Sequence, residues 1–188
     1  MINLPIAITL SRIGLAFVIA ACLFVGGPET AAAAAALFVL AALTDYWDGE
    51  LARRTGQVTR LGAMLDPIAD KALTLTCFTS LWFLALIPGW TVLVMALRDI
   101  AVTLLRLTPG SEDRATVRRS GKNKTILQLA YILAALVHIC GRDALPAVWP
   151  HEAVEQALLW GMYAVVVMTL WSGLRVYLSA SRVPGARS

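Results

Sequence analysis

Charged residues are scarce: Asp, Glu, Lys and Arg together make up 15% of the 188 residues. Soluble domains usually contain about a quarter charged residues, so this chain does not match the composition of a water-soluble protein. Hydrophobic residues make up 59% of the chain and the mean hydropathy is +0.72, which also excludes an intrinsically disordered protein. The composition therefore predicts a polytopic membrane protein, with room for about six spanning helices and no sizeable soluble domain.

Cysteine is scarce as well. Cys22, Cys77 and Cys140 are scattered through apolar stretches without C-x-x-C spacing, which excludes a disulfide scaffold and indicates buried, inert thiols. The first twenty residues contain neither a basic segment nor an A-x-A cleavage site, so we expect the first helix to remain as a permanent span.

Six apolar stretches predict an all-α bundle of six transmembrane helices, forming one catalytic domain over residues 1–178 with a short polar cytosolic tail at 179–188. The predicted spans are Leu4–Val25, Thr30–Arg53, Leu61–Leu86, Trp90–Leu107, Lys124–Cys140 and Ala157–Leu178. Most of these stretches reach spanning length only by including ionisable residues. Because a charge inside a membrane is costly, we expect those residues to face the bundle interior or the cytosolic interface.

The basic residues outside these spans are distributed unevenly. The loops expected after the first, third and fifth spans contain only Arg142, whereas the other two loops and the tail contain most of the remaining Lys and Arg. The positive-inside rule then places both termini and the two basic loops in the cytosol. The net charge of +4 is explained by anionic lipid headgroups and phosphorylated substrates, without nucleic acid.

Four aspartates cluster at the connected ends of the second and third predicted spans. Asp45 and Asp48 are three residues apart, and Asp66 and Asp70 are four apart, so each pair lies on one helix face. The short connection predicts antiparallel neighbouring helices whose pairs can face each other. Without nearby cations these carboxylates would repel one another and be driven toward protonation. Oxygen donors alone suit Mg²⁺ or Mn²⁺, and two ions could act as a clamp for displacement at phosphorus. The alternative is a set of buried ion pairs that only stabilises the bundle.

Small residues accompany the aspartates. Gly49 and Ala52 lie on the face of the first pair, Arg53 follows, and Gly62 lies one turn before Asp66. This arrangement fits a metal-bound pyrophosphate whose base occupies a cleft of small residues, with Arg53 on a phosphate.

The segment Asp45-x-x-Asp48-Gly49-x-x-Ala52-Arg53, followed after eight residues by Gly62-x-x-x-Asp66-x-x-x-Asp70, resembles the signature of the CDP-alcohol phosphotransferases at every fixed position. Asn3, Pro5, Thr9 and Arg12 also resemble the family's N-terminal element N-x-P-N-x-x-T-x-x-R, except that Ile6 replaces the second asparagine. The resemblance implies a six-helix membrane fold, usually dimeric, in a bacterial-type inner membrane with the active site open to the cytosol and to lipid.

The resemblance also implies roles for individual residues. Asp45 and Asp66 would contact both of two Mg²⁺ ions, with Mn²⁺ as a possible substitute, Asp48 would contact one ion, and Asp70 would contact the other and act as the general base. The residues expected to contact the donor, CDP-diacylglycerol, are Ile6, Thr9, Gly49, Ala52, Arg53, Thr59 and Gly62.

A second basic set indicates the acceptor alcohol. Arg98 and Arg106 are two turns apart on the fourth span, and Arg118, Lys122 and Lys124 follow the next loop. We expect these five residues to bind the phosphate of a small phosphorylated alcohol. The alternative for the loop residues is positive-inside charge on anionic lipid.

This series resembles the bacterial phosphatidylglycerophosphate synthases, which use glycerol 3-phosphate, although those often have Arg-Glu at the position of Arg98-Asp99. Cardiolipin synthases, which use phosphatidylglycerol, share the Arg-Asp pair, and phosphatidylinositol phosphate synthesis is a further alternative. The expected reaction is Mg²⁺-dependent transfer of a phosphatidyl group from CDP-diacylglycerol to glycerol 3-phosphate, giving phosphatidylglycerophosphate and CMP. Two other classes, a divalent-cation carrier and a catalytically silent subunit, are disfavoured because a carrier is expected to bind ions near the midplane and because the acids are intact.

Overall fold

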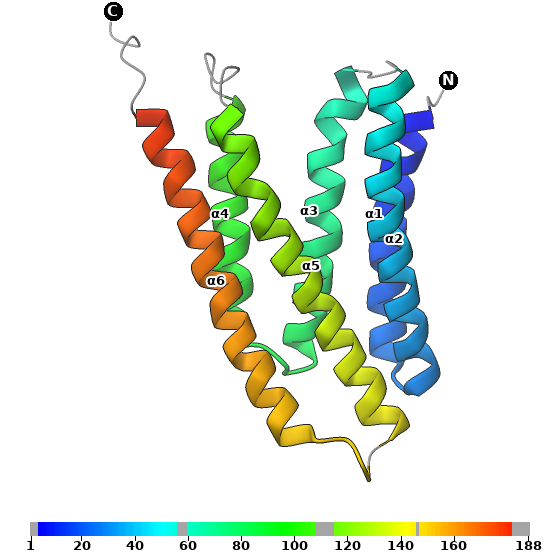
Figure 1. Ribbon diagram of the computed structural model, residues 1–188. Coiled ribbons are helices and arrows are strands. Elements are labelled where there is room, and N and C mark those ends of the chain that lie inside the picture. Colours follow the sequence, from blue (N-terminus) through cyan, green and yellow to red (C-terminus); the bar gives the residue numbers. More distant parts are fainter. Residues whose placement is uncertain (1–3, 56–59, 108–114, 146, 182–188) are drawn as a thin grey trace, which may run out of the picture.

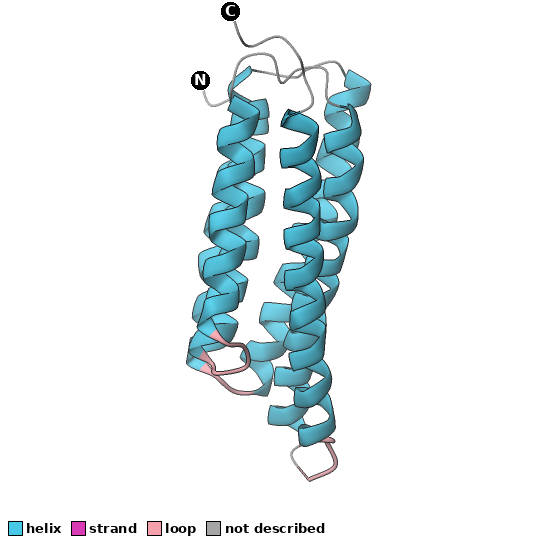
Figure 2. Ribbon diagram, turned by 90° about the vertical axis from the view of Figure 1, so that its left-hand side faces the viewer, coloured by secondary structure: helices cyan, strands magenta, loops and turns pink. Residues whose placement is uncertain are grey.

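The computed structural model is all-helical over the residues it describes, 4–55, 60–107, 115–145 and 147–181 (Figures 1 and 2). Side chains are described for residues 11–44, 71–104, 124–145 and 147–178. The helices of this part of the chain are α1 (Leu4–Val25), α2 (Pro28–Thr55), α3 (Arg60–Phe83), α4 (Gly89–Leu107), α5 (Ala115–Ala144) and α6 (His151–Ser181).

Helix α1 has the predicted bounds, and α2, α3 and α4 begin and end within three residues of theirs. Helix α5 begins nine residues before the predicted span, at Ala115, although its part that is apolar and long enough to cross a membrane begins at Lys124, as predicted. The predicted start of the sixth span is wrong, because both α6 and its apolar part begin six residues earlier, at His151. Hydropathy along the sequence identifies only the apolar part of a helix, whereas the backbone hydrogen bonds of the helix continue through its polar turns. Arg118 and Lys122 therefore lie on α5, and not in the preceding loop.

Successive helices run in opposite directions along the bundle (Figure 1). At one end, which we call the terminal end, α1, α3 and α5 begin and α2, α4 and α6 end; the opposite end is the far end. The first turn at the far end uses Gly26 and Gly27, whose φ angles of 75° and 101° favour glycine. The helix ends that flank the connections predicted to be basic thus lie at the same end as the start of α1 and the end of α6.

The helices form two groups. Helix α1 packs on both α2 and α3, and α6 packs on both α4 and α5. Helix α5 crosses obliquely from α6 toward α2, and α3 also contacts α4 and α5, which joins the groups (Figure 1). At the terminal end the two groups diverge in the ribbon view.

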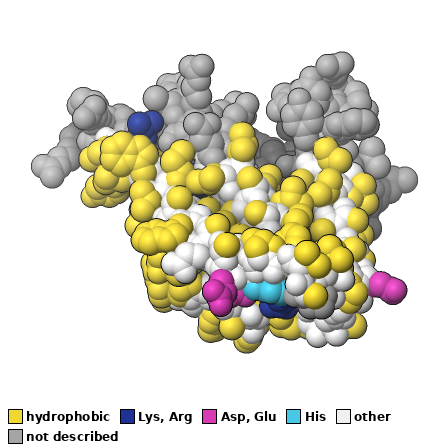
Figure 3. Space-filling model, turned by 60° about the horizontal axis from the view of Figure 1, so that its bottom comes forward, with side chains coloured by type: hydrophobic (Ala, Val, Ile, Leu, Met, Phe, Trp, Pro, Cys, Tyr) yellow, Lys and Arg dark blue, Asp and Glu magenta, His cyan; other side chains and the backbone are white. Residues whose placement is uncertain are grey.

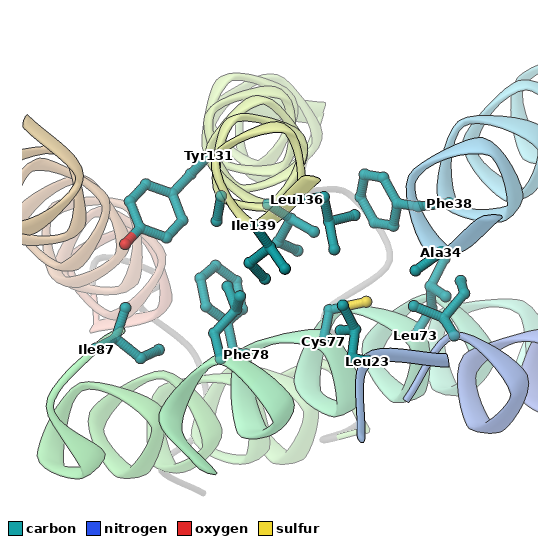
Figure 4. Close-up of a cluster of buried hydrophobic side chains, with 14 of the residues drawn as sticks. Leu23, Ala34, Phe38, Leu73, Cys77, Phe78, Ile87, Tyr131, Leu136 and Ile139 are labelled. Carbon is teal, nitrogen blue, oxygen red and sulfur yellow. The ribbon is translucent and has the colours of Figure 1, made fainter. Parts of the chain in front are cut away.

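The core that joins the groups lies toward the far end. Phe38, Phe78 and Leu136 are fully buried and come from α2, α3 and α5 (Figure 4). Tyr131 stacks on Phe78 with ring centroids 5.8 Å apart. Interdigitated side chains of this kind fix the far half of the bundle. The cysteines are free, as predicted, and Cys77 is buried in this core. The predicted burial is wrong for Cys22 and Cys140, which pack against the edge of the core and are only partly buried.

The outside of the bundle is apolar. Large exposed hydrophobic residues run along α4 and α6, among them Leu93, Leu97, Leu104, Leu170 and Trp171, and hydrophobic atoms dominate the face in Figure 3. In the described part of the chain, Lys124–Ala144 and His151–Leu178 are long and apolar enough to cross a membrane, and Ser11–Val25 and Pro28–Thr44 are shorter apolar helices. An outward-facing apolar surface is typical of a bundle surrounded by lipid.

Candidate active site

The backbone places the four aspartates of the signature at one level of the bundle. Asp45 and Asp48 lie ten and seven residues before the end of α2, and Asp66 and Asp70 lie six and ten residues after the start of α3. At 1.5 Å per residue, each is about 9–15 Å from the terminal end of its helix. The four residues between the helices span at most about 17 Å. The two pairs therefore occupy the same level of two connected antiparallel helices; their side chains lie outside the described set.

The residues expected to contact the donor lipid lie on the same three helices. Ile6 and Thr9 are on the first two turns of α1, Gly49, Ala52 and Arg53 are on α2, and Gly62 is on α3. Thr59 lies outside the described residues, as do the side chains of the other six. The backbone thus places six of the seven near the terminal end.

Asp99, on α4, is the centre of a polar network between helices. Its Oδ1 accepts a hydrogen bond from Lys124 Nζ of α5 at 2.5 Å and one from Arg98 Nη1 at 2.8 Å. The side chains of Lys124, Arg98 and Asp99 are 7%, 12% and 21% exposed. Charges removed from solvent in this way are stable only when they are paired and hydrogen-bonded, and one carboxylate supplies that pairing for two cations.

Arg98 also joins α4 to α6. Its Nε donates to the Thr169 carbonyl at 3.2 Å and its Nη2 donates to Ser172 Oγ at 2.7 Å. A Cβ on Gly173 would lie 3.2 Å from Arg98 Cγ, so the absence of a side chain there allows the arginine to lie close against α6. The guanidinium therefore has a fixed orientation, with contacts on two helices.

Lys71, on α3, completes the network. Its Nζ donates to the Asp99 carbonyl at 3.2 Å and to Thr103 Oγ1, and Thr103 Oγ1 donates to the same carbonyl at 2.7 Å. Lys71 directly follows Asp70 on α3, so its side chain connects the helix that carries Asp66 and Asp70 to α4.

Two cations share one counter-charge in this network. Arg98 and Lys124 both pair with the Asp99 carboxylate, while the Lys71 ammonium contacts the Asp99 backbone carbonyl. Two mostly buried cations that share one carboxylate favour an anionic ligand such as a phosphate.

Two of the five predicted acceptor residues, Arg98 and Lys124, are thus brought together by the structure. The other three are near the same end, Arg106 in the last turn of α4 and Arg118 and Lys122 in the first two turns of α5. Their side chains lie outside the described set.

Sequence reasoning missed the partners of these cations. The sequence motifs include Asp99 only as part of an Arg-Asp pair and assign no role to Lys71, Thr103 or Ser172. A polar residue in an apolar helix is a usable signal, because such residues face the bundle interior, but it does not indicate which residue each one contacts.

No group of three His, Cys, Asp or Glu side chains that could hold a metal is found among the side chains that the structure describes, a set that excludes the four signature aspartates. The donor chemistry of those four nevertheless fits a divalent cation, because four carboxylates at one level require positive charge and offer only oxygen.

Comparison with known proteins decides the family. The family model described as CDP-alcohol phosphatidyltransferase matches residues 2–171. The chain belongs to this family. A CDP-diacylglycerol--glycerol-3-phosphate 3-phosphatidyltransferase of Pectobacterium atrosepticum is 35% identical over 193 residues, covering 96% of this chain and 95% of the relative. The protein of the same name from Escherichia coli K12 is 35% identical over 189 residues with the same coverage, and that from Bacillus subtilis 168 is 38% identical over 151 residues, 73% and 78% of the two chains.

The chain is therefore a phosphatidyltransferase of a membrane-bound, divalent-metal-dependent family. This membership confirms the resemblance stated from the signature. The signature residues and the cation network are thus parts of a group-transfer enzyme.

Proposed function

We propose that this phosphatidyltransferase moves the phosphatidyl group of CDP-diacylglycerol to glycerol 3-phosphate, releasing CMP. The names of relatives that are 35–38% identical over most of the chain support this acceptor. The observation that carries the proposal is the network around Asp99, in which two cations, Arg98 and Lys124, share one carboxylate in a mostly buried site. A phosphate monoester carries close to two negative charges at neutral pH and is attracted more strongly to these cations than the phosphodiester of phosphatidylglycerol, which carries one.

Asp45, Asp48, Asp66 and Asp70 would hold the divalent metal, with Asp45 and Asp66 shared between two ions. Mg²⁺, or Mn²⁺ in its place, would bind the pyrophosphate and neutralise the charge that develops on it. The level placement of the two aspartate pairs on α2 and α3 supports this set.

The donor lipid would lie along α1, α2 and α3. Gly49, Ala52 and Gly62 leave room for the cytidine, Arg53 pairs with a phosphate, and Ile6, Thr9 and Thr59 complete the contacts. Small residues in consecutive turns allow a planar ligand to lie close to the backbone.

Asp70 would accept the proton from the C1 hydroxyl of glycerol 3-phosphate, whose oxygen attacks the β-phosphorus of the donor as the bond to CMP breaks. Lys124 and Arg98, with Arg106, Arg118 and Lys122, would hold the acceptor's own phosphate. Direct displacement requires no nucleophilic Ser, Cys or His, so no covalent enzyme intermediate forms.

The topology that fits this reaction has six spans in a bacterial inner membrane, with the terminal end in the cytosol, where the water-soluble substrate glycerol 3-phosphate is found. The shared end of the predicted basic connections supports this orientation. A homodimer is the expected assembly.

The test is CMP release from labelled CDP-diacylglycerol by the purified protein in lipid nanodiscs with Mg²⁺. Separate reactions contain glycerol 3-phosphate, phosphatidylglycerol, inositol phosphate or serine. We expect glycerol 3-phosphate to give a rate at least tenfold above the others and phosphatidylglycerophosphate as the product. A higher rate with any other acceptor would overturn the assignment.

A further inference from the structure

The two groups of helices are connected differently at two levels of the bundle. Toward the far end, the apolar core fills the space between α2, α3 and α5 (Figure 4). Near the middle of α3 and α4, a polar side chain crosses from one helix to the other. That side chain is Lys71.

The contacts of Lys71 are well defined. Two of its three N–H donors point to the Asp99 carbonyl, 3.2 Å away, and to Thr103 Oγ1. Thr103 donates to the same carbonyl at 2.7 Å, so its hydroxyl is held with a lone pair available for the lysine. The ammonium thus sits against one turn of α4, and Lys71 is itself half-buried.

The two turns joined by Lys71 carry different parts of the chemistry. On α3 the preceding residue is Asp70, which is the last of the four aspartates proposed to bind metal and is also the proposed general base. On α4 the same turn carries the Asp99 carboxylate, which holds Lys124 and Arg98. A change in the distance between these turns would move the base relative to the acceptor, and a misplacement of about 1 Å can cost about 100-fold in rate.

We propose that Lys71 is a positioning residue: it sets the spacing of α3 and α4 and so holds the Asp70 turn at the acceptor site. This inference rests on the proposed function, because it assigns the base to Asp70 and the acceptor to the Asp99 network. Lys71 acts through the backbone of α4 and does not itself bind substrate phosphate.

The test uses four variants of the network and one control variant in nanodiscs, with kcat and the KM for glycerol 3-phosphate measured at saturating CDP-diacylglycerol. Lys71→Met removes the ammonium, Thr103→Val removes its hydroxyl partner with little change in shape, and the third variant combines both. Thr103→Ser keeps the hydroxyl and is the conservative counterpart. Ser80→Ala is the matched control, because the Ser80 hydroxyl also donates to a carbonyl four residues earlier, at 2.9 Å, but lies in the far half of α3.

We expect Lys71→Met to lower kcat by 10- to 100-fold and Thr103→Val by 3- to 10-fold, with KM changed less than threefold in each. The double variant should lie within twofold of Lys71→Met, because both changes remove the same contact. Thr103→Ser and Ser80→Ala should stay within twofold of the unmodified enzyme. If Lys71→Met does not fold, the Thr103→Val and Thr103→Ser pair alone decides the proposal.

Three results would overturn it. A raised KM with unchanged kcat in Lys71→Met would make Lys71 a phosphate ligand. Full additivity in the double variant would mean that Thr103 is not its partner. Unchanged kcat in Thr103→Val would show that the contact between Lys71 and Thr103 of α4 does not affect turnover. If the unmodified enzyme prefers another acceptor, the proposed function fails, while the same kcat comparison with that acceptor still tests Lys71.

Discussion

The two aspartate pairs, on α2 and α3, and the polar network around Asp99 are specified by the sequence in different ways. The eight fixed residues of the signature lie within residues 45–70, on two helices joined by four residues. The network around Asp99 draws its members from α3, α4, α5 and α6, across residues 71–172. The first set is defined by helical spacing alone, whereas the second exists only when four helices have packed.

This difference reflects what each ligand requires. A divalent ion needs several carboxylates at fixed separations, which two short stretches of helix supply. A phosphate needs cations that are partly desolvated and held in place, and here the partners that hold them come from other helices: Asp99 for Lys124 and Ser172 for Arg98. The predictions that follow test whether the two regions act separately, from the largest effect to the smallest.

Removal of divalent metal should have the largest effect, because the aspartate region cannot hold the pyrophosphate without it. We expect EDTA to reduce CMP release to background and Mg²⁺ or Mn²⁺ to restore it, with K⁺ giving no recovery. Activity that persists after exhaustive chelation would show that the carboxylates serve another purpose.

Asp70→Asn should lower turnover by at least 1,000-fold, since it removes both a general base and a metal ligand. Binding of CDP-diacylglycerol, measured with labelled lipid, should be largely preserved because the other three aspartates remain. Turnover within tenfold of the unmodified enzyme would exclude Asp70 as the base.

Ser172→Ala should have the smallest effect. It removes one hydrogen bond from the Arg98 guanidinium, which keeps its contacts to Asp99 and Thr169. We expect the KM for glycerol 3-phosphate to rise less than fivefold and the free energy of unfolding to fall by about 1 kcal/mol. A change in the Mg²⁺ requirement of this variant would contradict the separation of the two regions.

The sequence was sufficient to predict the helices. Apolar stretches predicted all six helices in the described part of the chain, and α1 at both of its ends. They also placed the two aspartate pairs on α2 and α3, whereas the shared face of each pair and its metal remain predictions. The apolar part of α5 begins at Lys124, as predicted, but the predicted start of the sixth span was wrong because hydropathy does not detect the polar turns that follow Pro150.

The cation network could be predicted only in part. Arg98 and Lys124 were identified because charges in apolar helices need a function or a partner. That they share Asp99, and that Lys71 reaches Thr103 on another helix, depends on how α3, α4 and α5 are rotated against one another. Packing in three dimensions sets that rotation, and no periodicity along the chain reports it.

The most direct test of the two-region account compares Asp48→Asn with Lys124→Met in one set of assays. For each variant, the Mg²⁺ concentration at half-maximal rate and the KM for glycerol 3-phosphate are measured at saturating CDP-diacylglycerol. The account predicts that Asp48→Asn raises the Mg²⁺ requirement at least tenfold with KM within threefold, and that Lys124→Met raises KM by 10- to 100-fold with the Mg²⁺ requirement within threefold. The opposite pattern, or equal changes in both quantities for both variants, would contradict it.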